Sequence, residues 1–575
     1  MNYMDKYNKW LSNENLDADL RNQLESIAGN EKEIEDRFYQ ELEFGTAGLR
    51  GKLGAGTNRM NEYVIARATQ ALANVIKKEG QEAMDRGVAF AHDCRIFSPE
   101  FALLSALVMA SNGIRAYLFE SLRPTPELSY AIRYYKAISG VNITASHNPK
   151  DYNGYKVYWE EGSQIKSVIS DAVFEEISKL DIFGKYVTLT KEEAIEKGLL
   201  VIIGEEIDEV FYNEVMNTSL RSNDELDMSI KLVYTPLNGA GNTPVRIVLS
   251  RKGYENVYVV KEQEMPDGTF PTLVYPNPED LAAFEYSEKL AFEKNADILI
   301  ATDPDCDRLA VEVMHNGKIV ALNGNQTGVL LINYIVSTMK EKNIFPKNPV
   351  IVKSIVTGEM GTAVANKYGI EMINVLTGFK NICAIANMYE ESKEKNYIFG
   401  YEESIGYNIG TFLRDKDGVS SALMLTEMAA YYKKHNKTLI DVLTELFEEF
   451  GYYKEKGVSV VLDGMEGAKR IKRMMIKFRE IFPKTIGDAK LEEITDYKAQ
   501  TVFNVETGQI NPCEIEPTDA VKFLYDDGSW YTLRPSGTEP KIKLYVYVKD
   551  AVEEKSLEKL AKFEKEVLDV LYSID

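Results

Sequence analysis

Hydrophobic residues recur in two alternating patterns along the first third of the chain. Residues 61–78 place apolar side chains three or four positions apart, which predicts an amphipathic helix. The short apolar runs at 87–91 and 114–119 predict buried strands, with a helix over 100–111 between them. Because helices alternate with strands, we expect a mixed or parallel sheet covered by helices. A polar and mostly helical lead-in is expected over residues 5–43.

The same alternation returns twice further along the chain and then stops. A second block of strands and helices is expected at 230–234, 243–252, 257–260, 280–295 and 297–301. A third block is expected at 328–340, 350–354, 371–375 and 397–399. From about residue 455 the predicted strands, near 458–461, 521–525, 530–533 and 541–548, outnumber the helices, and a terminal helix runs from Val552. This last part is therefore α+β in character, whereas the preceding blocks are α/β.

Length and charge narrow the class of protein. The 575 residues are too many for one hydrophobic core, and roughly three to five domains are expected. The content of 45% hydrophobic and 27% charged residues is that of an ordinary globular protein. The formal net charge of −22 repels nucleic acid and anionic membrane surfaces, so neither is an expected partner.

The cysteines indicate neither disulfides nor a zinc site. Cys94, Cys306, Cys383 and Cys513 are far apart and form no CxxC spacing, which fits a reducing compartment. The N-terminal residues lack the apolar core of a signal peptide, and no apolar run reaches membrane-spanning length. We therefore expect a cytoplasmic protein.

The run Thr144–Pro149, TASHNP, sets a serine hydroxyl beside an imidazole. It follows Val141–Ile143, an alternating apolar stretch that is typical of the end of a buried strand. A strand fixes the root of such a loop, and the loop can then present Ser146 to a ligand with His147 close by. A simple turn is the alternative, because Asn-Pro dipeptides mark turns.

Three aspartates, Asp303, Asp305 and Asp307, follow the predicted strand at 297–301 with a spacing of two. In an extended segment this spacing places all three carboxylates on one side. Converging carboxylates repel each other unless a cation lies among them, and hard oxygen ligands favour Mg²⁺, with Mn²⁺ or Ca²⁺ as alternatives. A solvated acidic turn would also account for the run.

Two further loops carry polar side chains. Residues 400–407, GYEESIGY, set two acids and a hydroxyl between glycines, and such acceptors suit sugar hydroxyls, although an ordinary acidic loop is the alternative. Residues 534–541, RPSGTEPK, combine an arginine, two hydroxyls and a glycine, which favours a phosphate cradle over a simple turn. Together with the serine and aspartate loops, they indicate phosphoryl transfer on a phosphosugar.

Taken together and in this order, the four loops resemble those of the α-D-phosphohexomutase family, and the match spans nearly the whole chain. TASHNP resembles the family's phosphoserine loop, DPDCDR its metal loop, GYEESIG its sugar loop and RPSGTEPK its phosphate loop. Flanking segments match as well: FGTAGLRG at 44–51, RPTP at 123–126, NGYK at 153–156 and LTGFK at 376–380. GTNRMN at 56–61 and LRDKDG at 413–418 are similar to the bacterial phosphoglucomutase and phosphopentomutase branch.

The resemblance implies an α/β protein of four domains around a central cleft. Three are related mixed α/β domains, and the last is a smaller C-terminal α+β domain that we expect to open and close. The expected domains are residues 1–212 with the phosphoserine loop, 213–322 with the metal loop, 323–452 with the sugar loop and 453–575 with the phosphate loop. One departure is Asn238, which stands where relatives often have histidine, and no catalytic role is assigned to it.

The resemblance also implies roles for single residues. Ser146 is expected to carry the phosphoryl group, and one Mg²⁺ is expected on Ser146, Asp303, Asp305 and Asp307. His147, Lys156 and Lys380 are candidates for the general acid and base, since a lysine crowded by other cations has a depressed pKa. Arg50 resembles a family residue near the phosphoserine. Substrate is expected to bind Arg308, Glu402, Ser404, Arg534, Ser536, Gly537 and Thr538.

The implied reaction interconverts glucose 1-phosphate and glucose 6-phosphate through a phosphoserine and a glucose 1,6-bisphosphate intermediate. A sugar 1,6-bisphosphate is the expected activator, and the protein is expected to be a monomer or homodimer. Ser404 favours a hexose, with mannose, pentose or aminosugar phosphates as alternative substrates. A non-catalytic phosphosugar-binding paralogue and a metal-dependent phosphatase are alternative functions. The presence of Ser146 and all three aspartates argues against the paralogue.

Overall fold

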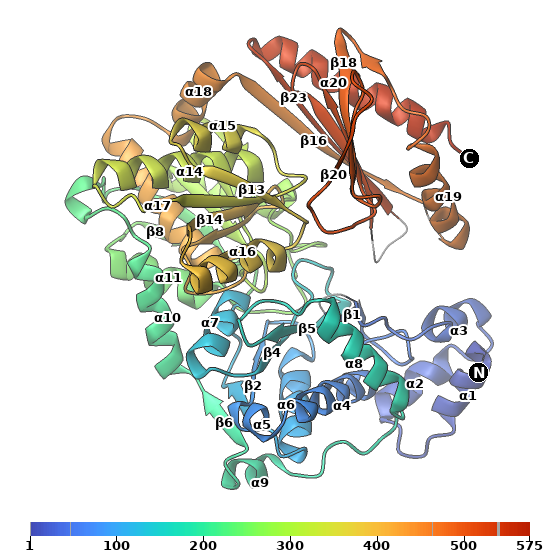
Figure 1. The fold of residues 1–575 in the computed structure, drawn as a ribbon. Coiled ribbons are helices and arrows are strands. Elements are labelled where there is room, and N and C mark those ends of the chain that lie inside the picture. The colour runs from blue at the N-terminus through green and yellow to red at the C-terminus, as the bar shows by residue number, and fades with distance from the viewer. Residues whose placement is uncertain (1, 46–47, 463, 537–540) are drawn as a thin grey trace.

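The computed structural model describes residues 2–45, 48–462, 464–536 and 541–575, and four sheets follow one another along the chain (Figure 1). The first sheet has the order β1 (Gly48–Lys52), β5 (Tyr152–Trp159), β4 (Ser139–Ile143), β2 (Val88–His92), β3 (Ala116–Phe119) and β6 (Leu200–Ile203). Strands β2, β3, β4 and β6 are parallel, and β5 runs antiparallel to both of its neighbours.

Helices cover both faces of this first sheet, with α6 and α7 packed directly on its strands. The helices of this part of the chain are α1 (Tyr3–Leu11), α2 (Ala18–Ser26), α3 (Glu31–Phe38), α4 (Glu62–Lys78), α5 (Gln81–Arg86), α6 (Ser98–Ser111), α7 (Thr125–Tyr135), α8 (Ser167–Lys179) and α9 (Lys191–Glu196). On β2, Val88 and Phe90 belong to one core cluster, whereas Ala89 and Ala91 belong to another. This alternation follows from the two-residue period of a strand, and it fits the burial of every residue of β2 and β4.

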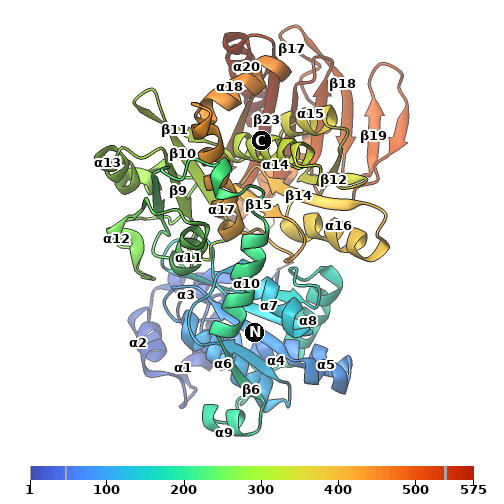
Figure 2. The same ribbon diagram turned by 90° about the vertical axis from the view of Figure 1, so that its left-hand side faces the viewer.

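The second sheet has a parallel centre and an antiparallel edge. Its order is β11 (Lys318–Leu322), β10 (Leu309–His315), β9 (Ile298–Thr302), β7 (Leu232–Thr235) and β8 (Val257–Val259). Its helical elements are α10 (Glu205–Asn217), η1 (Asn223–Glu225), α11 (Asn242–Lys252), α12 (Lys261–Glu264), η2 (Leu281–Phe284) and α13 (Glu285–Lys294). Helix α10 runs between the first domain and the upper part of the molecule (Figure 2).

The third sheet repeats that plan and shares its core with the second. Its order is β13 (Glu371–Val375), β12 (Pro349–Ser354), β14 (Asn396–Glu402) and β15 (Gly406–Ile409). Its helices are α14 (Gly324–Glu341), α15 (Met360–Lys367), α16 (Phe379–Ser392), α17 (Gly418–Lys434) and α18 (Leu439–Phe450). Helix α17 packs on both α11 and β15, and one buried cluster runs through both domains. The second and third domains are therefore fused.

The fourth domain is an antiparallel sheet backed by two helices. Its strands are β16 (Tyr452–Val461), β23 (Lys541–Asp550), β22 (Trp530–Pro535), β21 (Val521–Tyr525), β18 (Ala489–Asp496), β19 (Thr501–Asn504) and β20 (Ile510–Pro512), with β17 (Thr485–Ile486) paired to β18. Helices α19 (Gly464–Lys477) and α20 (Glu553–Tyr572) complete it, and α20 packs on β16 and β23. Figure 1 shows this domain at the upper right.

The expected fold class is confirmed: three α/β domains precede an α+β domain. Most expected elements lie within a few residues of the observed ones, and the helix expected at 61–78 is α4. The helix expected at 280–295 is divided into η2 and α13. No helix among the described residues is long and apolar enough to cross a bilayer.

Candidate active site

Ser146 lies in the loop that follows the fully buried strand β4. Its side chain is 3% exposed, and its backbone has φ = 52°, in the left-handed region that non-glycine residues rarely adopt. The Ser146 hydroxyl donates to Asp303 Oδ2 at 2.8 Å and lies 3.2 Å from His147 Nδ1. The serine therefore contacts both a metal-loop carboxylate and an imidazole.

Arg95, which was not identified from the sequence, holds the serine loop through hydrogen bonds to its backbone. Its buried guanidinium donates to the backbone oxygens of Ser146 (2.5 Å) and Asn148 (2.6 Å). Asp93 pairs with Arg95 at 3.1 Å and accepts from Thr144 Oγ1 at 2.7 Å. A charge-assisted network of this kind fixes the unusual backbone of the loop. The only sequence signal is an acid and a base directly after a strand.

Strand β5 packs tightly against the serine loop. A Cβ on Gly154 would lie 2.4 Å from the Thr144 carbonyl oxygen, so only glycine permits this approach. Two residues later, Lys156 Nζ lies 2.6 Å from Asp305 Oδ2 and 3.4 Å from Asp307 Oδ2. The NGYK segment thus brings a lysine to the aspartates.

The metal loop brings its three carboxylates together through a turn. Asp303, Asp305 and Asp307 are buried, and one ligand atom from each lies within 4.8 Å of the others. The three carboxylates converge as expected. The extended backbone that was expected to bring them together is wrong. Cys306 has φ = 52°, and its amide donates to the Asp303 carbonyl at 2.8 Å.

Cations and hydroxyls surround the triad, yet two of its oxygens have no hydrogen-bond partner in the part of the chain that the structure describes. Thr125 Oγ1 donates to Asp305 at 2.8 Å, and Lys416 Nζ lies 3.1 Å from Asp307. Among the residues that the structure describes, Asp305 Oδ1 and Asp307 Oδ1 are buried without a hydrogen-bond partner. An acceptor pair of this kind suits a hard divalent cation, so the residues fit a metal site. Lys416 lies in the LRDKDG segment and was not assigned a role from sequence.

Burial and charge shift the pKa values in opposite directions across the site. Burial, followed by repulsion from the other two carboxylates, raises the pKa of Asp303 well above its usual value. Burial also opposes ionisation of Asp305, but Lys156 outweighs it and the pKa of Asp305 is lowered. Burial and then Arg308 hold the pKa of His147 well below its usual value, so the imidazole is neutral.

Lys156 and Lys380, the two lysines proposed as general acid or base, have pKa values shifted in opposite directions. Burial works to lower the pKa of Lys156, but Asp305 and Asp307 outweigh it and raise that pKa. The depressed pKa expected for a lysine among cations is therefore wrong for Lys156 as placed. Burial lowers the pKa of Lys380, opposed by Glu516 and assisted by Lys166. Lys380 Nζ lies 3.4 Å from the Ile165 carbonyl oxygen.

The sugar and metal loops line a cleft of about 680 Å³ that reaches the fourth domain. Glu402 accepts from the Gly378 amide at 2.6 Å, which ties the sugar loop to the LTGFK segment. The cleft is lined by His147, Glu279, Arg308, Asn323, Asn325, Thr377, Gly378, Glu402, Glu403, Ser404, Glu455, Lys456, Gly457, Arg534, Lys543, Tyr545 and Tyr547. Residues from all four loops therefore face one cavity.

The phosphate loop enters this cleft through Arg534, joined by Lys543 on β23. Ser536 lies beside them, its amide donating to the Lys541 carbonyl at 2.7 Å. Gly537 and Thr538 lie outside the described residues. Glu279, Lys543 and Tyr545 were not identified from sequence, because no motif marks them.

The remaining expected residues lie at the rim of the serine and metal loops. Arg308 faces Glu279 at 3.6 Å, and its own amide donates to Asp303 at 3.0 Å. Arg50 on β1 donates to Asn148 Oδ1 at 3.1 Å, two residues after Ser146. Asn238, given no catalytic role, donates to the Met265 carbonyl at 2.8 Å.

Four family models cover most of the chain in the same order. They describe phosphoglucomutase/phosphomannomutase alpha/beta/alpha domain I (residues 41–182), domain II (209–316), domain III (323–450) and the C-terminal domain (483–568). Each model covers most of the strands of one of the four sheets.

Named relatives match along nearly their whole length. The chain is 35% identical over 517 residues to a phosphoglucomutase of Staphylococcus haemolyticus, covering 89% of this chain and 91% of that protein. It is 35% identical over 546 residues to a phosphoglucomutase of Staphylococcus epidermidis, covering 94% and 96%.

Solved structures share the fold. The open form of parafusin, a Paramecium phosphoglucomutase, superposes with a TM-score of 0.66 at 16% identity, covering 92% of this chain and 95% of that one. An Aspergillus fumigatus N-acetylphosphoglucosamine mutase, solved with GlcNAc-6P and magnesium, gives 0.50 at 12% identity, covering 92% and 96%.

The chain belongs to the phosphoglucomutase/phosphomannomutase family, the α-D-phosphohexomutases. It is accordingly an enzyme of the isomerase class, an intramolecular phosphotransferase.

Proposed function

We propose that the protein is a phosphoglucomutase that interconverts glucose 1-phosphate and glucose 6-phosphate through a phosphorylated Ser146 and a glucose 1,6-bisphosphate. The observation that carries this proposal is the shared cavity, where residues of the serine, metal, sugar and phosphate loops face one another. The names of the curated relatives support glucose as the sugar.

Asp303, Asp305 and Asp307, with an oxygen of phosphorylated Ser146, would hold one Mg²⁺. The partnerless oxygens of Asp305 and Asp307 support this choice, as does the magnesium in the Aspergillus relative. When bound, the ion offsets negative charge on the transferring phosphoryl group. Lys156 contacts Asp305 Oδ2 and Lys416 contacts Asp307 Oδ2, where they stabilise the ionised form of these two carboxylates.

The chain's own residues position the reactants and move the proton. The sugar hydroxyl loses its proton to a base and attacks the phosphorus on Ser146, the bond from phosphorus to Oγ breaks, and Oγ takes up a proton. In the second transfer Oγ loses that proton and attacks the other phosphorus of the bisphosphate, and the sugar oxygen that is released takes up a proton. Neutral His147, 3.2 Å from that oxygen, is one candidate for exchanging protons there, with Lys156 and Lys380 as the others. Glu402 and Ser404 would hold sugar hydroxyls, while Arg534, Ser536, Gly537, Thr538 and Lys543 would hold the phosphate that is not reacting.

The proposal is tested by a coupled assay with glucose 1-phosphate, mannose 1-phosphate and ribose 1-phosphate. We expect the highest kcat/KM with glucose 1-phosphate and stimulation by added glucose 1,6-bisphosphate. We also expect an added phosphate on Ser146 in the intact mass after incubation with the bisphosphate. Release of inorganic phosphate at the rate of turnover would instead identify a phosphatase, and preference for mannose or ribose would correct the substrate. The oligomeric state and a cytoplasmic location stay predictions.

A further inference from the structure

Glu403 lies between the two residues proposed to hold the sugar, and its side chain contacts the end of β12 and the loop after it, within the same third domain. One carboxylate oxygen, Oε2, accepts from Thr357 Oγ1 at 3.0 Å and from Ser354 Oγ at 3.2 Å. Both hydroxyl residues are fully buried at the end of β12. Glu403 therefore fastens the sugar loop to the loop at 355–358.

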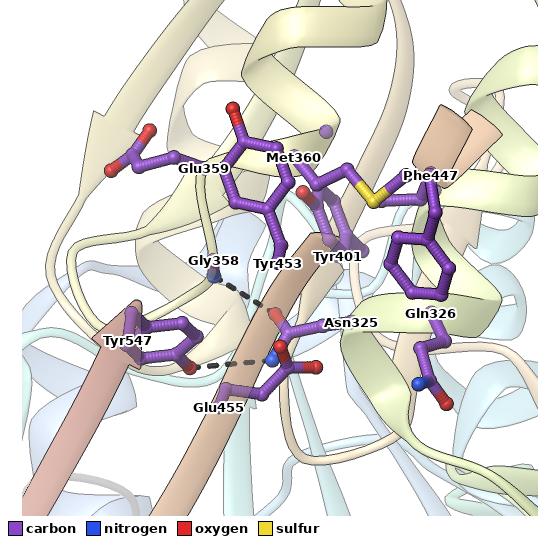
Figure 3. Close-up of a pocket in the computed structure, with 12 residues that line it drawn as sticks. Asn325, Gln326, Gly358, Glu359, Met360, Tyr401, Phe447, Tyr453, Glu455 and Tyr547 are labelled. Atoms are coloured by element: carbon purple, nitrogen blue, oxygen red, sulfur yellow. Dashed lines mark hydrogen bonds between the residues drawn. The ribbon is translucent and has the colours of Figure 1, made fainter. Parts of the chain in front are cut away.

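That same loop is where the fourth domain docks. Tyr547 on β23 donates to the Val356 carbonyl at 2.6 Å. Asn325 links the two sides, since it accepts from the Gly358 amide at 2.8 Å and donates to Tyr547 Oη at 3.3 Å (Figure 3). Ile355 and Val356 form one apolar cluster with aromatic residues of the fourth domain.

The backbone of Glu403 packs against the start of α14, the helix that carries Asn325. A Cβ on Gly324, the first residue of α14, would lie 2.1 Å from the Glu403 carbonyl oxygen. The next residue of α14 is Asn325. The side chain of Glu403 thus holds the Val356 loop, while its backbone packs against the helix that presents Asn325 to Tyr547.

The negative charge of the Glu403 carboxylate strengthens its hydrogen bonds from Thr357 and Ser354 at neutral pH. Burial, followed by the neighbouring Glu402, raises the pKa of Glu403 to about 6, opposed by Thr357 and by Lys543. The carboxylate is therefore ionised at pH 7, and bonds from hydroxyls to an ionised acceptor are the stronger kind. Among the described residues of the fourth domain, Tyr545 and Tyr547 also face this carboxylate, in addition to Lys543.

We propose that Glu403 is a positioning residue that couples the sugar loop to the docking of the fourth domain. The coupling rests on the proposed function, because it matters only if a bisphosphate must be held between transfers. Glucose 1,6-bisphosphate leaves Ser146 unphosphorylated each time it escapes, and activity then depends on bisphosphate in solution. Glu403 keeps the domain that grips the distal phosphate in register with the loop that grips the sugar, so that the intermediate stays bound.

The test compares Glu403→Gln, Tyr547→Phe and the double variant with the wild type, using glucose 1-phosphate with and without added glucose 1,6-bisphosphate. Each single variant should need roughly 5–50-fold more bisphosphate for half-maximal activity, and the double variant should need little more than either, because coupled residues are non-additive. At saturating bisphosphate most of the lost kcat should return. Glu371→Gln, at an exposed ion pair with Lys395 on the same domain, is the matched control and should behave as the wild type.

An unchanged bisphosphate requirement in Glu403→Gln would overturn the inference, as would fully additive effects in the double variant. A loss of kcat that saturating bisphosphate does not restore would also overturn it. Thr357→Val removes one of the two hydroxyls that bond Glu403 Oε2 and should raise the bisphosphate requirement in the same way, so the inference stays testable even if Glu403→Gln folds poorly. Failure of the proposed function is separate, since it would appear as a wild type without mutase activity.

Discussion

The junction between the first two domains differs sharply from the junction between the last two. At the first, Ser146, Thr125 and Lys156 of domain I bond directly to the buried aspartates of domain II. At the second, the contacts that the described residues make between domains III and IV include the hydrogen bonds of Tyr547 with Val356 and Asn325 and that of Asn323 with Glu455. A small apolar cluster and the ion pair of Lys522 with Glu359 at 3.6 Å join them.

The contrast indicates that the serine and aspartate loops, the chemical end of the site, are fixed relative to each other. Domain IV with its phosphate loop, the movable end of the site, is able to change its position. Buried charge-assisted bonds over 2.6–2.8 Å keep the serine and the triad in register, as a phosphoryl transfer requires. A junction of few contacts opens at lower free energy than a continuous core. Domains II and III, by comparison, share one core and are expected to move together.

The largest effect is expected from Ser146→Ala, which removes the phosphoryl acceptor from the fixed end. Turnover should fall by at least about 10⁴-fold, because no other group takes the phosphoryl. Intact-mass measurement should find no phosphate after incubation with glucose 1,6-bisphosphate. Thermal unfolding should stay close to that of the wild type. A variant with near-native rate would show that Ser146 is not the nucleophile.

The second largest effect is expected from Asp305→Asn, since it removes a charge from the triad and leaves Lys156 without its nearest charged partner. We expect a loss of about 10²–10³-fold in kcat. Isothermal titration should also show weaker Mg²⁺ binding. Asp171→Asn on the exposed face of α8 is the control and should change neither quantity. Unaltered Mg²⁺ affinity in Asp305→Asn would contradict the metal assignment.

Lys522→Met tests the movable end. The ammonium lies 3.6 Å from Glu359 and 4.1 Å from the centre of the Trp530 ring, where it links the two domains. Its loss should raise KM for glucose 1-phosphate by roughly 3–10-fold with a smaller change in kcat. Lys498→Met, at an exposed lysine of the same domain, is the control. Equal losses in kcat and kcat/KM would place Lys522 at the chemical end instead.

The smallest effect is expected from Glu455→Gln on β16, where the chain enters domain IV. Burial raises the pKa of Glu455 to about 7, above its value of about 4.3 when unfolded. The folded state thus holds the extra proton, and stability falls as pH rises between these values. Calorimetry should find the variant more stable than the wild type by about 1–2 kcal/mol at pH 8 and nearly equal at pH 5. A difference that grows as pH falls would contradict this sign.

Many helices and strands could be predicted from the sequence, because the spacing of apolar residues and the positions of glycines depend on the conformation of the nearby chain. The strand before Ser146 and the helix at 61–78 were predicted on that basis and are β4 and α4. The convergence of the aspartates was also expected, but the turn at Cys306 was not. A left-handed residue within such a run is set by packing against the Gly418 segment, which is remote in sequence.

What the sequence did not reveal depends on contacts between distant segments. Arg95 supports the serine loop from more than fifty positions away, and Lys416 reaches Asp307 from another domain. The raised pKa of Lys156 arises from the same cause, since two carboxylates of a different domain surround it. The domain limits at 212, 322 and 452 stay predictions.

The stacking of Trp530 on Tyr547, with ring centres 4.1 Å apart, has a practical consequence. Only three tryptophans are present in the chain, and Trp530 alone belongs to the cluster that receives Ile355 and Val356. Its indole fluorescence should therefore change when the last domain swings, which gives an optical signal of closure in a protein with no attached dye.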